Sequence, residues 1–79
     1  MQTKLYYFKD YGYIEINIKD PMEAKGITRN ALAHAIDARF EVINKWYQGN
    51  VERIDTDILA KICCVLECSP GDIIHYKKD

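Results

Sequence analysis

The stretch 29–48, RNALAHAIDARFEVINKWYQ, constrains the fold more than any other part of this chain. Its apolar residues form two groups at helical spacing, 32–36 and 43–47, and these are separated by a break at Asp37. Gly49 follows the second group, and glycine is the residue type that most often closes a helix. Two short helices joined by a tight turn are therefore expected.

The residues near the break allow the two helices to cross closely. Ala33 has the small side chain that such a crossing needs. Asp37 is one of the few non-glycine residue types that tolerate the left-handed turn conformation. The stretch therefore predicts a helix-turn-helix.

Length and charge limit the possible partners. A chain of 79 residues makes one domain with a small core, so we expect pairing with a second copy. The formal net charge of -1 does not favour nucleic acid over the whole chain. However, residues 25–53 hold five Lys or Arg against three Asp or Glu, whereas residues 55–72 hold one against four. The basic excess lies on the predicted helix-turn-helix.

Membrane, metal and enzyme classes have little support. No apolar run approaches the about 18 residues that a membrane span needs, and there is no signal-peptide core, so a cytoplasmic protein is expected. An odd number of cysteines does not make a disulfide framework and indicates thiols in a reducing compartment. No zinc-ligand spacing, phosphate loop, acid pair or activated nucleophile is present, so we predict no metal, cofactor, small-molecule ligand or catalysis. The residues weighed here are Cys63, Cys64, Cys68, His34 and His75.

The segment 5–18, LYYFKDYGYIEINI, has strand character because isoleucine alternates with other residues from 13 to 18. Residues 9–12 have turn chemistry, so a short hairpin is the first interpretation, and one strand with an irregular lead-in is the alternative. An isolated hairpin is only marginally stable. The segment is therefore expected to pack on the helices or to pair across a dimer.

The helices are expected at these places. Asp20-Pro21 opens a first helix that presents Met22 to the core and ends at Gly26. Thr28 caps the second helix, 29–36, and the third covers 40–48.

Asp55 caps a fourth helix that runs to about residue 67 and carries Cys63 on its buried face. Ser69 then opens a short fifth helix through residues 73–75. The fold class is thus mainly α, with five helices and a short N-terminal β-strand or hairpin. One domain is expected over 1–79, divided into an extension 1–18 and a helical part 19–76 that contains the helix-turn-helix 29–48.

The run LAHAIDARFEVINKWYQG, with EAKGIT before it and RIDTDILAKICCVLECSPGDIIHY after it, resembles the phage-repressor-like (Cro/CI-type, xenobiotic-response-element) helix-turn-helix family. The resemblance covers about residues 17–76. It implies a small bacterial or phage regulator with five helices, which binds palindromic operators in double-stranded DNA as a homodimer. Three features depart from the family pattern: Asp37 stands where glycine is usual, Arg39 where a hydroxyl residue is usual, and residues 50–52 where the loop is often basic.

The second helix of a helix-turn-helix enters the major groove, where its first residues meet base edges. Arginine and lysine suit guanine O6 and N7, phenylalanine a thymine methyl, and glutamate the N4 amino group of cytosine. We interpret the following residues as base contacts: Arg39, Phe40, Glu41, Asn44 and Lys45. The following are interpreted as phosphate contacts: Thr28, Arg29, Gln48, Asn50 and Arg53.

Two functions remain open at this point. The first is a transcriptional regulator, a repressor of phage, mobile-element or antitoxin type. The second is a protein-interaction module that keeps the fold but has lost or weakened DNA binding, as the near-neutral charge and the positions of Glu41 and Glu52 suggest. Without the family pattern, the same polar residues also fit an ordinary solvated helix face.

Overall fold

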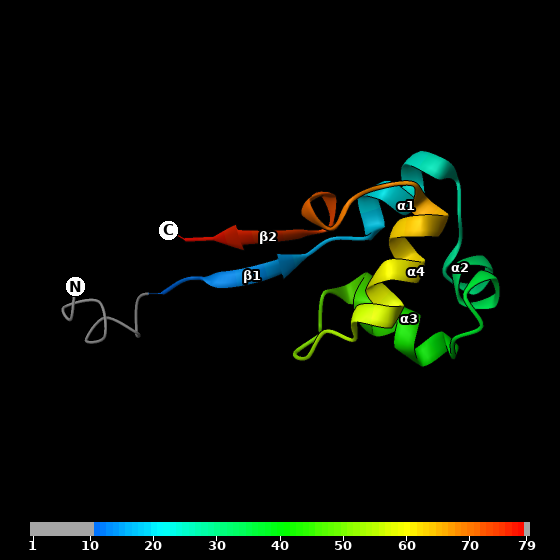
Figure 1. Cartoon of the computed structure of the whole chain (residues 1–79), viewed down its shortest axis with the longest axis horizontal. Coiled ribbons are helices and arrows are strands. Elements are labelled where there is room, and N and C mark those ends of the chain that lie inside the picture. Colours follow the sequence, from blue (N-terminus) through cyan, green and yellow to red (C-terminus); the bar gives the residue numbers. More distant parts are fainter. Residues whose placement is uncertain (1–10, 79) are drawn as a thin grey trace.

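The computed structural model describes residues 11–78, which fold into four α-helices and a two-stranded antiparallel sheet. The helices form one body, and the two strands project from it as a ribbon (Figure 1). In chain order the elements are β1 Tyr13–Ile16, α1 Lys19–Lys25, α2 Arg29–Ala35, α3 Phe40–Gln48, α4 Thr56–Leu66, a 3₁₀ turn Pro70–Asp72 and β2 Ile74–Lys77.

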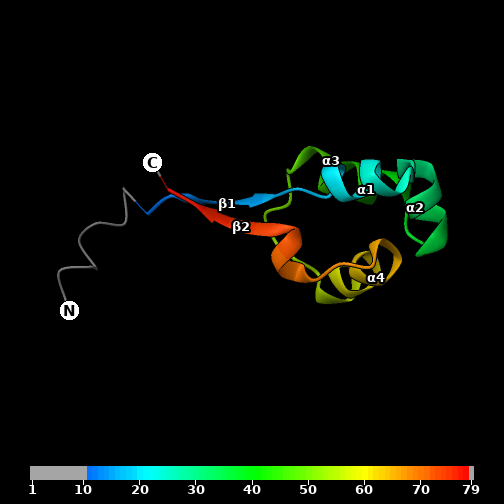
Figure 2. The same ribbon diagram turned by 90° about the horizontal axis from the view of Figure 1, so that it is seen from above.

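The core lies where the helices meet the base of the ribbon. Seen from above, α4 lies across from α1 and α2 (Figure 2). Truncating a fully buried leucine or isoleucine to alanine costs about 2–5 kcal/mol, so a small set of such residues accounts for much of the stability. The fully buried large side chains are Ile18, Met22, Leu32, Ile43, Ile62, Leu66 and Ile73.

Each of these four helices is followed by a residue in the left-handed conformation: Gly26, Asp37, Gly49 and Glu67, with φ between 54° and 76°. The next N–H then donates back to a carbonyl five residues earlier, as from Ala38 to Ala33 at 2.9 Å. These bonds satisfy carbonyls that the helix end leaves free. The predicted turn at Asp37 and the predicted ends at Gly26 and Gly49 are confirmed.

Two predicted helix starts are also confirmed. Thr28 Oγ1 accepts a hydrogen bond from the Ala31 N–H at 3.1 Å. Asp55 Oδ1 accepts from the N–H groups of Asp57 and Ile58 at 2.8 and 3.3 Å. Such caps pair N–H groups that have no partner inside the helix.

The start of α1 differs from the prediction that Asp20 caps it. The helix begins at Lys19, with Ile18 in the cap position. Asn17 provides the capping contact instead, because its Oδ1 accepts from the Asp20 N–H at 3.1 Å and its Nδ2 donates to the Asp20 carboxylate at 3.0 Å. Pro21 is therefore the third helical residue, still within the first turn, where its missing N–H costs no helical hydrogen bond.

The predicted fifth helix after Ser69 is wrong. Pro70–Asp72 make a 3₁₀ turn, after which the chain continues as β2 and pairs with β1, so that Ile74 lies opposite Ile16. A short isolated helix is costly to nucleate, whereas pairing gives the backbone of both strands hydrogen-bond partners. The β-branched and aromatic residues of β2 also favour a strand.

The predicted strand at 13–18 is confirmed for Tyr13–Ile16, and within residues 11–78 it pairs with β2. The partner comes from the opposite end of the chain. The other strand of the expected hairpin falls mainly on residues 5–10, which lie outside the described residues. Between residues 11 and 78, no helix is long and apolar enough to cross a membrane.

Candidate nucleic-acid interface

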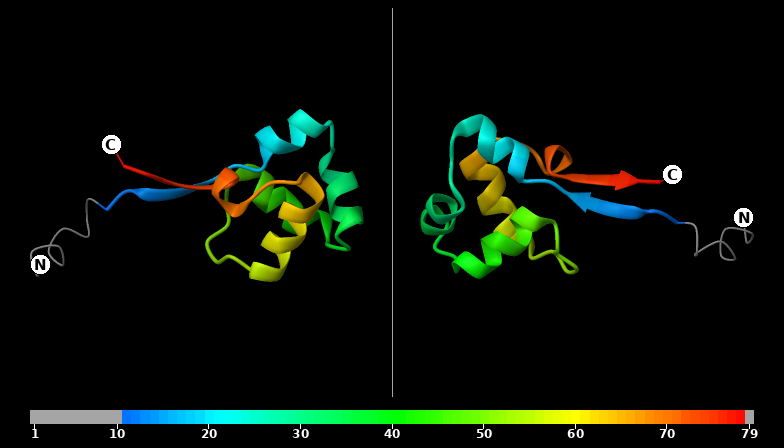
Figure 3. Two further views of the ribbon diagram at one scale, coloured as in Figure 1. Left: turned by 45° about the horizontal axis from the view of Figure 1, so that its top comes forward. Right: turned by 180° about the vertical axis from the view of Figure 1, so that it is seen from behind.

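The helices α2 and α3 form the predicted helix-turn-helix: α2 lies at the end of the body away from the ribbon, and α3 runs from there back toward the base of the ribbon (Figure 3). Ala33, Ile43 and Trp46 are 5%, 0% and 3% exposed, so the predicted inward faces of both helices are confirmed. The residues of α3 between these buried positions are consequently turned outward.

The residues interpreted as base contacts lie on this outward side of α3 or at its start. Arg39 occupies the cap position and its side chain makes no capping hydrogen bond. Phe40 is 40% exposed although it is apolar. Glu41 and Lys45 are exposed, whereas Asn44 is half-buried.

Arg29 lies between the two helices. Its Nη1 donates a hydrogen bond of 2.7 Å to Oδ1 of Asn44. Its guanidinium carbon is 4.6 Å from the centre of the Tyr47 ring and 5.7 Å from that of Phe40. Hydrogen bonds to charged groups contribute about 1.5–3 kcal/mol, and cation–π contacts about 0.5–2 kcal/mol. Arg29, which the sequence predicts as a phosphate contact, therefore also holds α3 against α2.

No local sequence pattern indicates this cluster, because Arg29 and Asn44 are 15 residues apart and meet only when the helices cross. Lys19 is a second residue of the candidate site that the sequence does not indicate. It precedes the helix-turn-helix by ten positions, yet its Nζ lies 5.8 Å from the centre of the Tyr47 ring. The tertiary structure thus adds a cation beside the C-terminal half of α3.

The predicted phosphate contacts lie at both ends of the helix-turn-helix. Thr28 is exposed, and its hydroxyl caps α2. Gln48, Asn50 and Arg53 are exposed at the end of α3 and in the loop that follows it.

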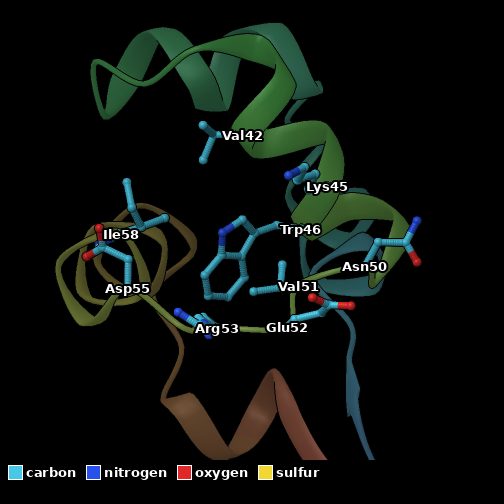
Figure 4. A pocket seen from close by; sticks show the side chains of 9 residues that line it. All are labelled: Val42, Lys45, Trp46, Asn50, Val51, Glu52, Arg53, Asp55 and Ile58. Atoms are coloured by element: carbon cyan, nitrogen blue, oxygen red, sulfur yellow. The ribbon is translucent and has the colours of Figure 1, made fainter.

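That loop borders a pocket of about 620 Å³ between the C-terminal half of α3 and the start of α4. The indole of Trp46 lies at its centre, between Val51 and Ile58 (Figure 4). Lys45 of α3 and residues of the loop thus line the same pocket. Its polar lining residues are Lys45, Asn50, Glu52, Arg53 and Asp55.

The cysteines lie near the C-terminal end of α4, on the other side of the core. Cys63 is half-buried against the core, less buried than predicted, and Cys64 is exposed. Burial raises the pKa of the Cys68 thiol above its ordinary value, which keeps it protonated at neutral pH. All three are free thiols.

Comparison with known proteins agrees with this arrangement. Residues 17–79 match the family described as the Cro/C1-type HTH DNA-binding domain. The crystal structure of the transcriptional regulator VanUg, Form II, has a similar fold, with a TM-score of 0.65 at 21% sequence identity over 92% of this chain and 95% of that chain. A comparison with curated proteins gives no match. Because the matched residues include the whole of α1 to β2, the chain belongs to the Cro/C1-type family of helix-turn-helix DNA-binding domains.

Proposed function

We propose that this protein binds duplex DNA sequence-specifically and regulates transcription as a repressor of phage, mobile-element or antitoxin type. The observation that carries the proposal is the α2–α3 unit of a Cro/C1-type domain whose second helix turns Arg39, Glu41 and Lys45 to solvent. In such a unit the second helix enters the major groove. Polar and charged groups on its outward side then meet base edges.

Four side chains on α3 or at its start suit three kinds of base edge. Arg39 and Lys45 donate to guanine O6 and N7, Glu41 accepts from cytosine N4, and Phe40 contacts a thymine methyl. Each good bidentate contact contributes about 1–3 kcal/mol of discrimination against the wrong base.

Asn44 has a narrower role. Its Oδ1 already accepts from Arg29, so its Nδ2 group is the one presented to DNA. An amide N–H donates to acceptors such as guanine O6 or N7, thymine O4 or a phosphate oxygen.

Phosphate contacts set the register of the protein on the duplex and provide most of the salt-dependent affinity. Arg29 has several N–H donors, so it can hold Asn44 and donate to a phosphate at the same time. We add Lys19 to the predicted set because the structure places it beside Tyr47 of α3. The proposed phosphate contacts are Lys19, Thr28, Arg29, Gln48, Asn50 and Arg53.

We further propose that the protein acts as a homodimer on a palindromic operator. Helix-turn-helix dimers place their recognition helices on half-sites one helical turn apart, about 34–36 Å, so the symmetry of the operator reflects that of the protein.

The test is selection of bound sites from random duplexes, followed by anisotropy titrations of the parent, Arg39→Ala and Lys45→Ala against the selected site and a scrambled duplex. Each substitution should weaken binding to the selected site by about 1–3 kcal/mol and relax preference at one base pair. Lys61→Ala is the matched control, because it removes the same charge from α4, where Lys61 pairs with Asp57 at 2.9 Å. It should leave binding unchanged.

Two results would count against this function. If Arg39→Ala and Lys45→Ala bind both duplexes as the parent does, α3 is not the reading helix. If the parent shows no salt-dependent affinity for any duplex, the protein-interaction module is the better account, since phosphate contacts necessarily release counterions.

A further inference from the structure

The ribbon has one apolar and one polar face. The strand register sets Ile14 opposite Tyr76 and Ile16 opposite Ile74, and opposed residues of an antiparallel pair point to the same side. These four side chains form what we term the apolar ribbon face. The opposite face carries Tyr13, Glu15, His75 and Lys77.

The apolar ribbon face begins in the core and continues beyond it. Ile16 is 7% exposed, and Ile74 packs partly buried against the core. Ile14 and Tyr76, one pair further out, are 55% and 61% exposed. Figure 1 shows why: the outer half of the ribbon extends past the helices, which therefore do not cover it.

The Glu15 carboxylate and the Tyr76 hydroxyl have partners within the chain, whereas Nδ1 of His75 is buried without a hydrogen-bond partner among residues 11–78. The Glu15 carboxylate lies 3.6 Å from Nδ1 of His75 and 3.7 Å from Nζ of Lys77, on the polar face. The hydroxyl of Tyr76 donates to the carbonyl of Tyr11, so its ring is the part that remains available. The exposed apolar ribbon face thus suits an apolar partner rather than a charged one.

We propose that the apolar ribbon face packs against the same face of a second copy of this chain across a two-fold axis. The inference rests on the proposed function and names the interface of its homodimer. A two-fold contact needs a self-complementary patch, and this face opposes no like charges because its four residues are uncharged. Two sheets can stack face to face at about 10 Å.

The position of the ribbon also fits a DNA-binding dimer. The ribbon leaves the helical body on the side away from α2, and its outer half extends past the helices, so a second copy on this outer half leaves α2 uncovered (Figure 2). An isolated two-stranded ribbon is marginal in water, and a second ribbon stabilises its outer half.

The size of the face sets the expected strength. Stable interfaces bury about 800 Å² per partner, more than the exposed parts of two side chains on four-residue strands provide. In the absence of DNA the dimer is therefore weak, with a dissociation constant that we expect to be about micromolar or higher. Two adjacent half-sites tighten it, since binding of the first subunit raises the effective concentration of the second.

The test compares Ile14→Glu with Tyr13→Glu. These neighbouring residues are 55% and 57% exposed but lie on opposite faces, and a glutamate at position 13 has Lys77 opposite it. Sedimentation over a range from micromolar to millimolar should show a dimer for the parent and Tyr13→Glu, and a monomer for Ile14→Glu. Circular dichroism confirms that each variant is folded. For the unsubstituted protein, dilution should shift the amide NMR signals of β1 and β2 most.

The proposal is overturned if Ile14→Glu assembles as the parent does, if Tyr13→Glu dissociates equally, or if the parent is monomeric throughout. It is also overturned if deleting residues 1–10 converts a monomeric parent into a dimer, because that segment would then be the occupant of the face. On DNA, Ile14→Glu should bind a single half-site as the parent does and lose at least about tenfold on a duplex with two half-sites. If no variant binds DNA but the sedimentation difference persists, the proposed function fails and this interface stands.

Discussion

Nη1 of Arg29, the first residue of α2, donates a 2.7 Å hydrogen bond to Oδ1 of Asn44 in the middle of α3. The same guanidinium stacks on the ring of Tyr47 one turn further along α3. The Arg29 side chain thus helps, together with the buried Ile43 and Trp46, to fix the rotation of α3 about its own axis relative to α2. Because that rotation decides which side chains face outward, Arg29 links the packing of the two helices to the surface proposed to read DNA.

A double-mutant cycle on Arg29→Ala and Asn44→Ala tests this link. Each change should destabilise the fold, and the coupling between them should be about 1–2 kcal/mol, because the hydrogen bond is charge-assisted and part-buried. Urea unfolding measures the four free energies. Additivity within about 0.5 kcal/mol would show that the contact does not stabilise the native state. In DNA titrations, Arg29→Ala alone should also reduce the salt slope by about one unit on every sequence.

The turn at Asp37 provides a second prediction. Its φ of 56° places a non-glycine residue in the left-handed region. Asp37→Gly should raise the free energy of unfolding by about 0.5–1 kcal/mol, since removing Cβ relieves more strain than the added freedom of the unfolded chain costs. Asp37→Val should lower it by about 1–3 kcal/mol, because a β-branched residue is poorly accommodated there. Thermal unfolding measures the melting temperature of both variants against that of the parent. A melting temperature of Asp37→Gly below that of the parent would contradict the expectation.

Acid sensitivity provides a third prediction. The Asp72 carboxylate accepts from the backbone N–H and the hydroxyl of Ser69 at 2.9 and 3.1 Å, and these bonds lower the pKa of Asp72 below its ordinary value of 3.8. A carboxyl whose folded pKa is depressed stabilises the fold above its unfolded pKa and loses this contribution as pH falls through the folded pKa. The stability provided by Asp72 should therefore be complete above pH 3.8 and disappear below it.

Asp72→Asn isolates this effect, because asparagine keeps the size of the side chain and does not titrate. The variant should be less stable than the parent at neutral pH, and the difference should shrink in acid. Urea unfolding from pH 7 downward measures it. The parent should still lose some stability in acid through Glu67, whose pKa is lowered by its ion pair with Lys25. A pH-independent gap between Asp72→Asn and the parent would exclude the proposed titration.

Local sequence features predicted most of the helical elements. Helix α3 has the expected bounds, and Thr28, Asp55 and Gly49 begin and end helices where predicted, because capping depends on side chains within a few residues of each helix end. The same reasoning failed at residues 73–75. A capping pattern at Ser69 indicates a helix start, but the neighbour that decides the outcome, β1, is more than fifty residues away.

The candidate site also has features that the local sequence predicts and features that depend on the tertiary structure. Helical periodicity alone predicts that Ile43 and Trp46 point inward, and hence which residues of α3 point outward. It cannot predict that Arg29 meets Asn44, or that Lys19 approaches Tyr47, because those contacts depend on how separate helices cross.

By itself, then, the sequence determined the helix-turn-helix, its caps and its inward and outward faces, since each follows from contacts between residues close together in the chain. Only the tertiary structure decided the β1–β2 ribbon, its exposed apolar face and the Arg29 cluster between α2 and α3. These features join residues from distant parts of the chain, and the energy of such contacts exists only once the core has brought the two parts together.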